Sequence, residues 1–149
     1  FSLLFPLKES EYVLLDYTAV KNGWRGQGIG GKMMRCVLTS EAVRGRKLVL
    51  EVEDPDFGDE PELRKDRIRF YRKFGARELA GVRYLLPPLD GTVPTEMRLM
   101  LVGSNEKKMP GASVQALIQL IYQEVYRRGP EDELLNSFLC DVPKSVDLL

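Results

Sequence analysis

The stretch LLDYTAVKNGWRGQGIGGKMM (Leu14–Met34) joins three patterns that decide the fold. It begins inside an apolar and aromatic run, residues 11–20, which predicts a buried strand. Four glycines then fall within the six residues 26–31. From Ile29 to about Val43 the apolar residues recur at helical spacing, which predicts an amphipathic helix. A glycine-rich loop that leads from a strand into a helix is typical of phosphate-binding sites.

Three phosphate-binding motifs can be laid over this loop. The nucleotide-triphosphate loop would use Gly26, Gly31 and Lys32, but it needs Ser or Thr after the lysine to hold magnesium. Met33 stands in that place, and a thioether is a poor ligand for a hard cation. The sequence therefore argues against a triphosphate site.

The dinucleotide-binding fingerprint would use Gly26, Gly28 and Gly31, and an acidic residue does follow at the end of the next strand. In that fold the first glycine follows the strand directly, whereas residues 21–25 intervene here. The later segments also run from a helix into two antiparallel strands, where a doubly wound fold alternates strands and helices. Both observations argue against the dinucleotide-binding fingerprint as the interpretation of this loop.

The third motif is Arg25-x-x-Gly28-x-Gly30. Its glycines let the backbone approach a diphosphate without side chains in the way. The amides of residues 27–31 would then point at the anion from the helix N-terminus, where the helix dipole favours negative charge. A glycine-rich turn without a ligand is the alternative, so the choice depends on the rest of the chain.

The remaining segments supply further strands and helices. RKLVLEVE, residues 46–53, predicts a second buried strand, and an acidic loop follows it. A helix that stops at Gly75 comes next, and then VRYLLPP and TEMRLMLV, which predict an antiparallel strand pair. The polar SNEKKMPG predicts a boundary. It divides the chain into a core over residues 1–103 and a helical extension over residues 104–149.

Several of these segments together resemble the Gcn5-related N-acetyltransferase (GNAT) family. The opening stretch is similar to the family's fourth strand and pyrophosphate loop, LVLEVE to its fifth strand, and IRFYRKFGA to its helix with an aromatic–Tyr–x–x–Phe/Leu–Gly pattern. The resemblance covers residues 12–102. It implies an α/β (α+β) protein with the GNAT acyl-CoA N-acyltransferase fold, in which helices flank a mixed, mostly antiparallel sheet. It also implies the transfer of an acetyl group from acetyl-CoA to a primary amine.

The resemblance further implies where acetyl-CoA binds. In the family the fourth and fifth strands splay apart, and the thioester lies in the gap. Main-chain groups of the fourth strand pair with the pantetheine as an added strand would, and the glycine loop holds the pyrophosphate. Carried onto this chain, the cofactor-binding residues are Thr18, Ala19, Val20, Arg25, Gly26, Gln27, Gly28, Ile29, Gly30, Gly31 and Lys32.

The implied mechanism needs an acid for the leaving thiolate and a base for the attacking amine. Tyr71 stands where the family has its acid, and a phenol with an ordinary pKa of about 10 can protonate a departing thiolate. Packing in the core beside Phe70 is the alternative role. Glu51 is the best candidate for the base, since several subfamilies carry a glutamate at the equivalent place. Glu53 and Asp16 are further candidates, and a solvated strand position is the alternative for each carboxylate.

The chain departs from the family pattern in two ways. Arg64 and Arg67 stand where members often carry Asn and Ala, which brings the usual pantetheine contact of that Asn into question. Only FSLLFPL precedes the fourth strand, so the family's first strand and two helices are absent and we expect the chain to be a fragment. Both departures favour the rival interpretation, a non-catalytic acyl-CoA-binding or interaction module with the GNAT fold.

Two further segments carry expectations of their own. The stripe Val114–Val125 would expose apolar side chains, so it must pack on the core or form a homodimer contact. The acidic loop after Glu53 either attracts a cationic amine or is simply solvated. The acceptor itself can be a small-molecule amine, or the N-terminus or a lysine of a protein.

Composition limits the chemistry and the partners. Lys plus Arg and Asp plus Glu both number 22, and a net charge of zero argues against a nucleic-acid partner. No apolar run approaches the roughly 18 residues of a membrane span. The chain has no histidine, which excludes a Ser-His-Asp triad and a His-based zinc site, and we expect no metal. We expect Cys36 and Cys140 to be buried thiols in a reducing cytoplasm.

Overall fold

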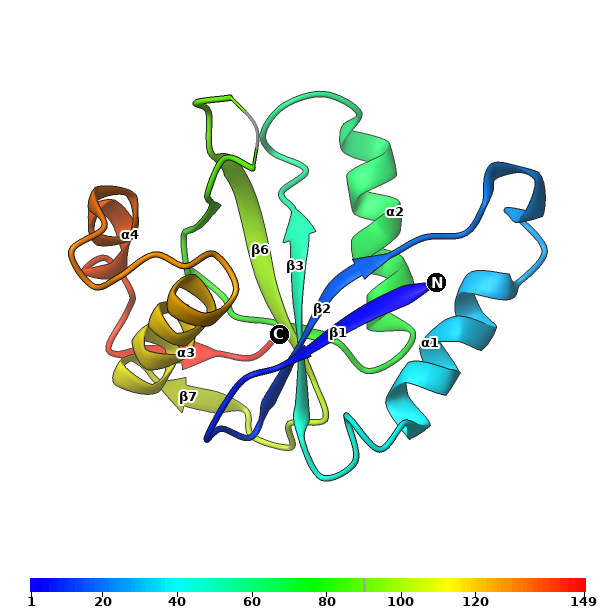
Figure 1. Ribbon diagram of the computed structural model, residues 1–149, viewed down its shortest axis with the longest axis horizontal. Helices are drawn as coiled ribbons and strands as arrows, with labels where there is room; N and C mark the ends of the chain where they lie inside the picture. The colour runs from blue at the N-terminus through cyan, green and yellow to red at the C-terminus, as the bar shows by residue number, and fades with distance from the viewer. Residues whose placement is uncertain (90) are drawn as a thin grey trace.

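One mixed sheet separates two layers of helices in the computed structural model, which describes residues 1–89 and 91–149 (Figure 1). The elements follow one another as β1 (Ser2–Pro6), β2 (Tyr12–Thr18), the 3₁₀ turn η1 (Asn22–Trp24), α1 (Ile29–Thr39), β3 (Lys47–Glu53), α2 (Pro61–Arg72), β4 (Arg77–Glu78), β5 (Tyr84–Leu86), β6 (Thr95–Val102), β7 (Lys108–Pro110), α3 (Gly111–Glu124), α4 (Glu133–Leu139) and β8 (Ser145–Asp147).

The main sheet has the strand order β1-β2-β3-β6-β4, with β5 also paired to β6. Within the described part of the chain, β2 and β3 are the single parallel pair, and every other ladder is antiparallel. The expected class, a mixed and mostly antiparallel sheet with flanking helices, is therefore confirmed. The expected antiparallel pairing of the strands around residues 84–86 and 95–102 is confirmed as well.

Alternation along β3 distributes the core between the two helical layers. Leu48, Leu50 and Val52 belong to a buried cluster that also holds Met34 of α1 and Ile68 of α2. Val49, on the opposite face, belongs to the cluster that holds the buried side chains of α3 and α4. Figure 1 shows α1 and α2 to one side of the strands, and α3 and α4 to the other.

The extension is part of this core. Val114, Ile118 and Ile121 of α3 are fully buried in one cluster with Leu14 and Leu101 of the sheet. The end of the chain also returns to the sheet, because the amides and carbonyls of Leu149 and Glu78 exchange hydrogen bonds of 2.8 and 3.0 Å. The apolar stripe predicted on α3 is thus covered by the core of the same chain.

Helix ends differ from the predictions by a few residues. α1 stops at Thr39 instead of continuing to about Val43, because Ser40 turns extended and its hydroxyl donates to the Val37 carbonyl. α3 stops at Glu124, one residue before the end of the predicted apolar stripe Val114–Val125. Among residues 1–89 and 91–149, no helix has both the length and the apolar character that crossing a bilayer requires.

Both cysteines are free thiols, but the expected burial is wrong, since Cys36 and Cys140 are exposed. On α1 the buried side chains are Met34 and Val37, so Cys36 falls on the outward face. Cys140 follows directly after α4 and lies outside the cluster formed by Phe138 and its neighbours.

The two parallel strands separate halfway along their length. Their pairing runs from Tyr12 opposite Lys47 to Leu15 opposite Leu50 and then ends, although both strands continue. At that point β1 places Leu4 opposite Leu15 but Leu3 opposite Tyr17, so Asp16 is an extra, bulged residue.

A β-bulge bends its strand and increases the local twist. Beyond the bulge at Asp16, β2 stays paired with β1 as far as Thr18, while β3 stays paired with β6 as far as Glu53. The sheet therefore opens into a wedge between β2 and β3, which Figure 1 shows as the divergence of these strands.

Candidate functional site

The wedge holds a cavity of about 720 Å³. Its walls are the ends of β2 and β3, one side of α2, and residues of β5 and β6. The cavity brings together all four predicted catalytic residues, Asp16, Glu51, Glu53 and Tyr71. Predicted binding residues on the wall are Thr18, Ala19, Val20, Arg25 and Gly30.

A second cavity of about 270 Å³ adjoins the first at the glycine loop. The two share Val20, Arg25, Gly30 and Phe70 on their walls, and the smaller one also includes Gly26, Gly28, Ile29 and Gly31. Gln27 and Lys32, also predicted to bind, line neither cavity. The Gln27 amide donates instead to the Gly23 carbonyl at 3.2 Å.

The loop conformation depends on two glycines with left-handed backbone. Gly26 has a φ of 77° and Gly28 a φ of 74°, and no atom lies within 4 Å of where a Cβ would stand. The requirement for glycine is therefore one of backbone conformation and not of close packing. Gly28 is also the N-cap residue of α1, and no side chain caps that end, so the amides of the first turn are open.

The surroundings of this helix N-terminus are positively charged. Residues 17–40 contain the basic side chains Lys21, Arg25, Lys32 and Arg35 and no acidic one, in a chain whose net charge is zero. The Arg25 Nε donates to the Val20 carbonyl at 3.2 Å, which ties the loop to the end of β2. Open amides, a helix dipole and local positive charge together favour an anion here.

The edge of β2 that faces the wedge is unpaired. Ala19 exchanges both main-chain hydrogen bonds with Phe1, at 3.0 and 2.9 Å, on the β1 side. Because successive residues of a strand direct their main-chain groups to opposite edges, Thr18 and Val20 direct theirs into the wedge. An extended ligand in the cavity would find donors and acceptors at this edge.

Glu51 is the central polar group of the wedge. The hydroxyl of Tyr84 donates to one carboxylate oxygen, and the hydroxyl of Tyr126 donates to the other at 2.6 Å. Burial raises the pKa of Glu51 to about 6, even though both phenol hydrogen bonds favour the charged form and oppose the rise. The nearby charge of Asp16 adds to the increase in this pKa. A carboxylate that titrates near neutrality is suited to accept a proton.

Tyr71 of α2 lines the same cavity with a phenol that stays protonated near neutral pH. Burial raises its pKa, and the positive charge of Arg67, one helical turn earlier, offsets part of that rise. Its ring also packs edge-on against Phe70, with 5.2 Å between ring centroids. The geometry therefore accommodates both predicted roles, proton donor and packed aromatic.

The other two carboxylates have different surroundings. Glu53, at the end of β3, forms an ion pair with Arg67 and a longer one of 3.8 Å with Arg64. Asp16 is exposed at the bulge of β2. Neither carboxylate is enclosed by phenol donors as Glu51 is.

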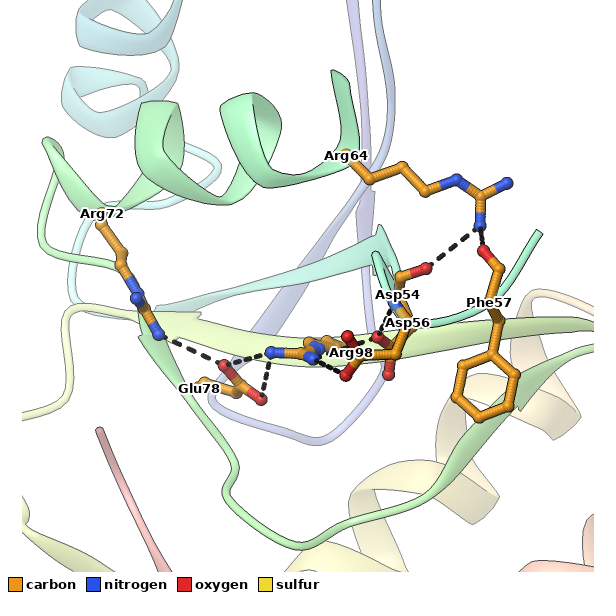
Figure 2. Close-up of polar contacts among 7 residues, drawn as sticks. All are labelled: Asp54, Asp56, Phe57, Arg64, Arg72, Glu78 and Arg98. Carbon is orange, nitrogen blue, oxygen red and sulfur yellow. Dashed lines mark hydrogen bonds and ion pairs between the residues drawn. The ribbon is translucent and has the colours of Figure 1, made fainter. Parts of the chain in front are cut away.

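The acidic loop after β3 is fixed by arginines. Figure 2 shows Arg98 of β6 between Glu78 on one side and the carboxylates of Asp54 and Asp56 on the other, at 3.3, 3.1 and 2.8 Å. Arg64 reaches from α2 to the carbonyl oxygens of Asp54 and Phe57.

These contacts assign Arg64 to holding the loop, where the family pattern would place a residue that touches the ligand. They also pair two of the loop's acidic side chains, Asp54 and Asp56, so less negative charge is free to attract a cation.

Two residues of the site escaped the sequence analysis. Tyr84 lies in an apolar strand and Tyr126 lies 75 positions from Glu51, beyond the predicted core. A tyrosine among apolar residues tends to be buried, and its hydroxyl then needs a hydrogen-bond partner. This need was the one feature of the sequence that pointed to a polar contact at Tyr84. The sequence could not name Glu51 as that partner.

Comparison of the chain with protein-family models, curated proteins and solved structures gave no match.

The raised pKa of Glu51 predicts a pH-dependent cost to stability. The folded state holds the proton of the Glu51 carboxyl more tightly than the unfolded chain does. The stability gained from this protonated carboxyl is therefore fully present below about pH 4.5 and lost as pH rises through 6. The loss amounts to about 2 kcal/mol. Between acid and neutral pH, wild type should lose about this much unfolding free energy relative to Glu51→Gln, measured by urea denaturation.

The exposed Glu41 provides the control. Glu41→Gln shows how much replacing a glutamate by glutamine changes stability at a position outside the cavity. A difference in unfolding free energy between wild type and Glu51→Gln that does not change with pH would contradict a raised pKa of Glu51.

Proposed function

We propose that this protein is a GNAT-type N-acetyltransferase, an acyltransferase that moves an acetyl group from acetyl-CoA to a primary amine. The wedge between β2 and β3 carries this proposal, because it combines an enclosed carboxylate, a protonated phenol and an adjoining anion site. The resemblance of residues 12–102 to the GNAT family and the strand order around the wedge agree with the same function.

The volume of the main cavity and the polar groups around both cavities support acetyl-CoA as the ligand. Ligand pockets commonly enclose about 300–1,000 Å³, and the main cavity falls within this range. The open amides of α1 would hold the pyrophosphate, and Arg25 and Lys32 would add positive charge. The main-chain groups of Thr18 and the amide of Val20 would pair with the pantetheine amides. The acetyl thioester would then lie at the inner end of the wedge, next to Glu51 and Tyr71.

The chemistry requires one new C–N bond, one broken C–S bond and two proton transfers. Glu51 takes a proton from the attacking amine, directly or through a water molecule, as nitrogen bonds to the thioester carbonyl carbon. Tyr71 gives a proton to the departing sulfur. Glu51 serves as the base better than Glu53, because Glu53 is already neutralised by Arg67. Asp16 is exposed, whereas two tyrosine hydroxyls enclose the carboxylate of Glu51.

The rival function is a non-catalytic acyl-CoA-binding module. Its specific support is that both oxygens of Glu51 already accept hydrogen bonds from tyrosines. An ionised carboxylate offers about four acceptor sites, however, so each oxygen keeps capacity for a water or an amine. The two functions differ in whether thiol is released from acetyl-CoA in the presence of an amine.

Two conservative variants test the catalytic roles. Glu51→Gln removes the base and Tyr71→Phe removes the acid, so each should lower kcat for thiol release by about 100-fold. Acetyl-CoA affinity should stay within about threefold, since neither group forms the anion site. Tyr12→Phe, at the paired end of β2, is the matched control and should keep wild-type turnover. Saturable acetyl-CoA binding without thiol release on any amine of a panel would favour the rival module.

Gly28 tests the pyrophosphate loop separately. An alanine there keeps its methyl group free of protein atoms, but it strains the left-handed backbone and adds bulk where a diphosphate would approach. Gly28→Ala should weaken acetyl-CoA binding about tenfold in isothermal titration calorimetry.

Gly45 is a close control for this variant. It has a φ of 73° and an equally open Cβ position, but it lies in the turn between α1 and β3. Gly45→Ala should therefore share the backbone strain and leave affinity unchanged. Equal affinities for the two variants would remove the loop from the cofactor site.

A further inference from the structure

The carboxylate of Glu51 receives one of its two hydrogen bonds from outside the strands and helices that form the wedge. The donor, Tyr126, follows the end of α3, in the C-terminal segment that the sequence separates from the core. We propose that Tyr126 is a positioning residue for Glu51, so that the C-terminal segment completes the reactive end of the wedge. The catalytic part of this proposal rests on the proposed function.

An aromatic cluster fixes the position of the Tyr126 ring. It packs edge-on against Tyr122 of α3, with centroids 5.9 Å apart, and Tyr122 packs in turn against Tyr84 and against Phe138 of α4. The Tyr122 hydroxyl donates to the Leu85 carbonyl, which ties α3 to β5. The Tyr126 hydroxyl is thus placed by the packing of the C-terminal helices, and its reach to Glu51 follows from that packing.

Tyr126 acts on Glu51 as a donor throughout the neutral range. Burial, followed by the negative charge of Glu51, raises the pKa of Tyr126 far above neutrality, so the phenol keeps its proton. A hydrogen bond to the ionised form stabilises it and lowers the pKa of the acceptor. With Tyr84 on one oxygen and Tyr126 on the other, rotation of the carboxylate is also restricted.

Besides burial, three groups determine how Glu51 titrates. Tyr84 from β5 and Tyr126 after α3 favour the charged form, whereas Asp16 from β2 opposes it. Tyr122 from α3 is close enough for the Glu51 charge to influence its pKa, but its hydroxyl is bonded to Leu85. Loss of the Tyr126 hydroxyl should therefore move the titration of Glu51 upward, while loss of the Tyr122 hydroxyl should leave it in place.

A purely structural role for Tyr126 would make it one more link between the C-terminal segment and the sheet. Tyr122 is such a link by the same chemistry, which makes Tyr122→Phe a matched control for Tyr126→Phe. Both variants keep the ring and remove one hydrogen bond that is at least partly buried, so both lower thermal stability. The two differ in whether the lost donor contacts Glu51.

The test follows the titration of Glu51 in two independent ways. Carboxyl ¹³C NMR of the full chain without ligand gives the pKa of Glu51 directly, and the acidic limb of kcat/KM for acetyl transfer gives the kinetic value of the same pKa in the free enzyme. In Tyr126→Phe both should rise by about one pH unit, with kcat lowered more than KM is raised. In Tyr122→Phe both should match wild type. Tyr84→Phe should shift Glu51 in the same direction as Tyr126→Phe.

The outcomes separate the two levels of the proposal. A Glu51 titration that is the same in Tyr126→Phe and wild type overturns the positioning role, whether or not acetyl transfer is found. If Tyr126→Phe shifts the titration of Glu51 but wild type transfers no acetyl group, the proposed function is overturned, and with it the catalytic meaning of Tyr126. A shift in both NMR and kinetics, absent from Tyr122→Phe, supports the positioning role.

Discussion

The ladder between β2 and β3 ends at Leu15 and Leu50, and the main cavity of the site depends on that ending. The bulge at Asp16 turns β2 away with β1, while β6 keeps β3 straight to Glu53. Separation of two parallel strands ends the hydrogen bonding between their facing backbone edges and opens a cavity between them. A continuous ladder would fill this space with hydrogen-bonded backbone and leave nothing for a ligand to pair with.

The wedge also determines the electrostatics of Glu51. The residue stands just past the last β2–β3 pair, where its carboxylate is enclosed but still borders the cavity. Enclosure raises the pKa of Glu51, and the hydrogen bonds from the hydroxyls of Tyr84 and Tyr126 offset part of that rise. The two opposing influences come from parts of the chain far apart in sequence, so the chemistry of the site depends on the completed fold.

Local patterns predicted much of this architecture. The order of the longer strands and helices and the glycine loop were accessible, because strand runs, helical spacing and glycine-rich turns are properties of neighbouring residues. The candidate residues Glu51 and Tyr71 came from the resemblance to the GNAT family, and their roles stay predictions. Long-range contacts were not accessible. Nothing near Tyr126 indicates a partner 75 positions away.

Exposure was the other property that local patterns left open. Cys36 stands between the buried Met34 and Val37, but the orientation of α1 turns it outward. Likewise, the pairing of Glu53 with Arg67 depends on how α2 packs beside the end of β3, which the spacing of these residues does not specify.

The most direct test of the central claim is a titration of the ¹⁵N-labelled protein with CoA, followed by amide NMR. If the wedge and its glycine loop form the cofactor site, saturable shifts should be largest at the amides of Thr18, Val20 and Gly28–Gly31, with little change at β7 and β8. Shifts that avoid these amides, or no saturable shift at all, would contradict a CoA site between β2 and β3.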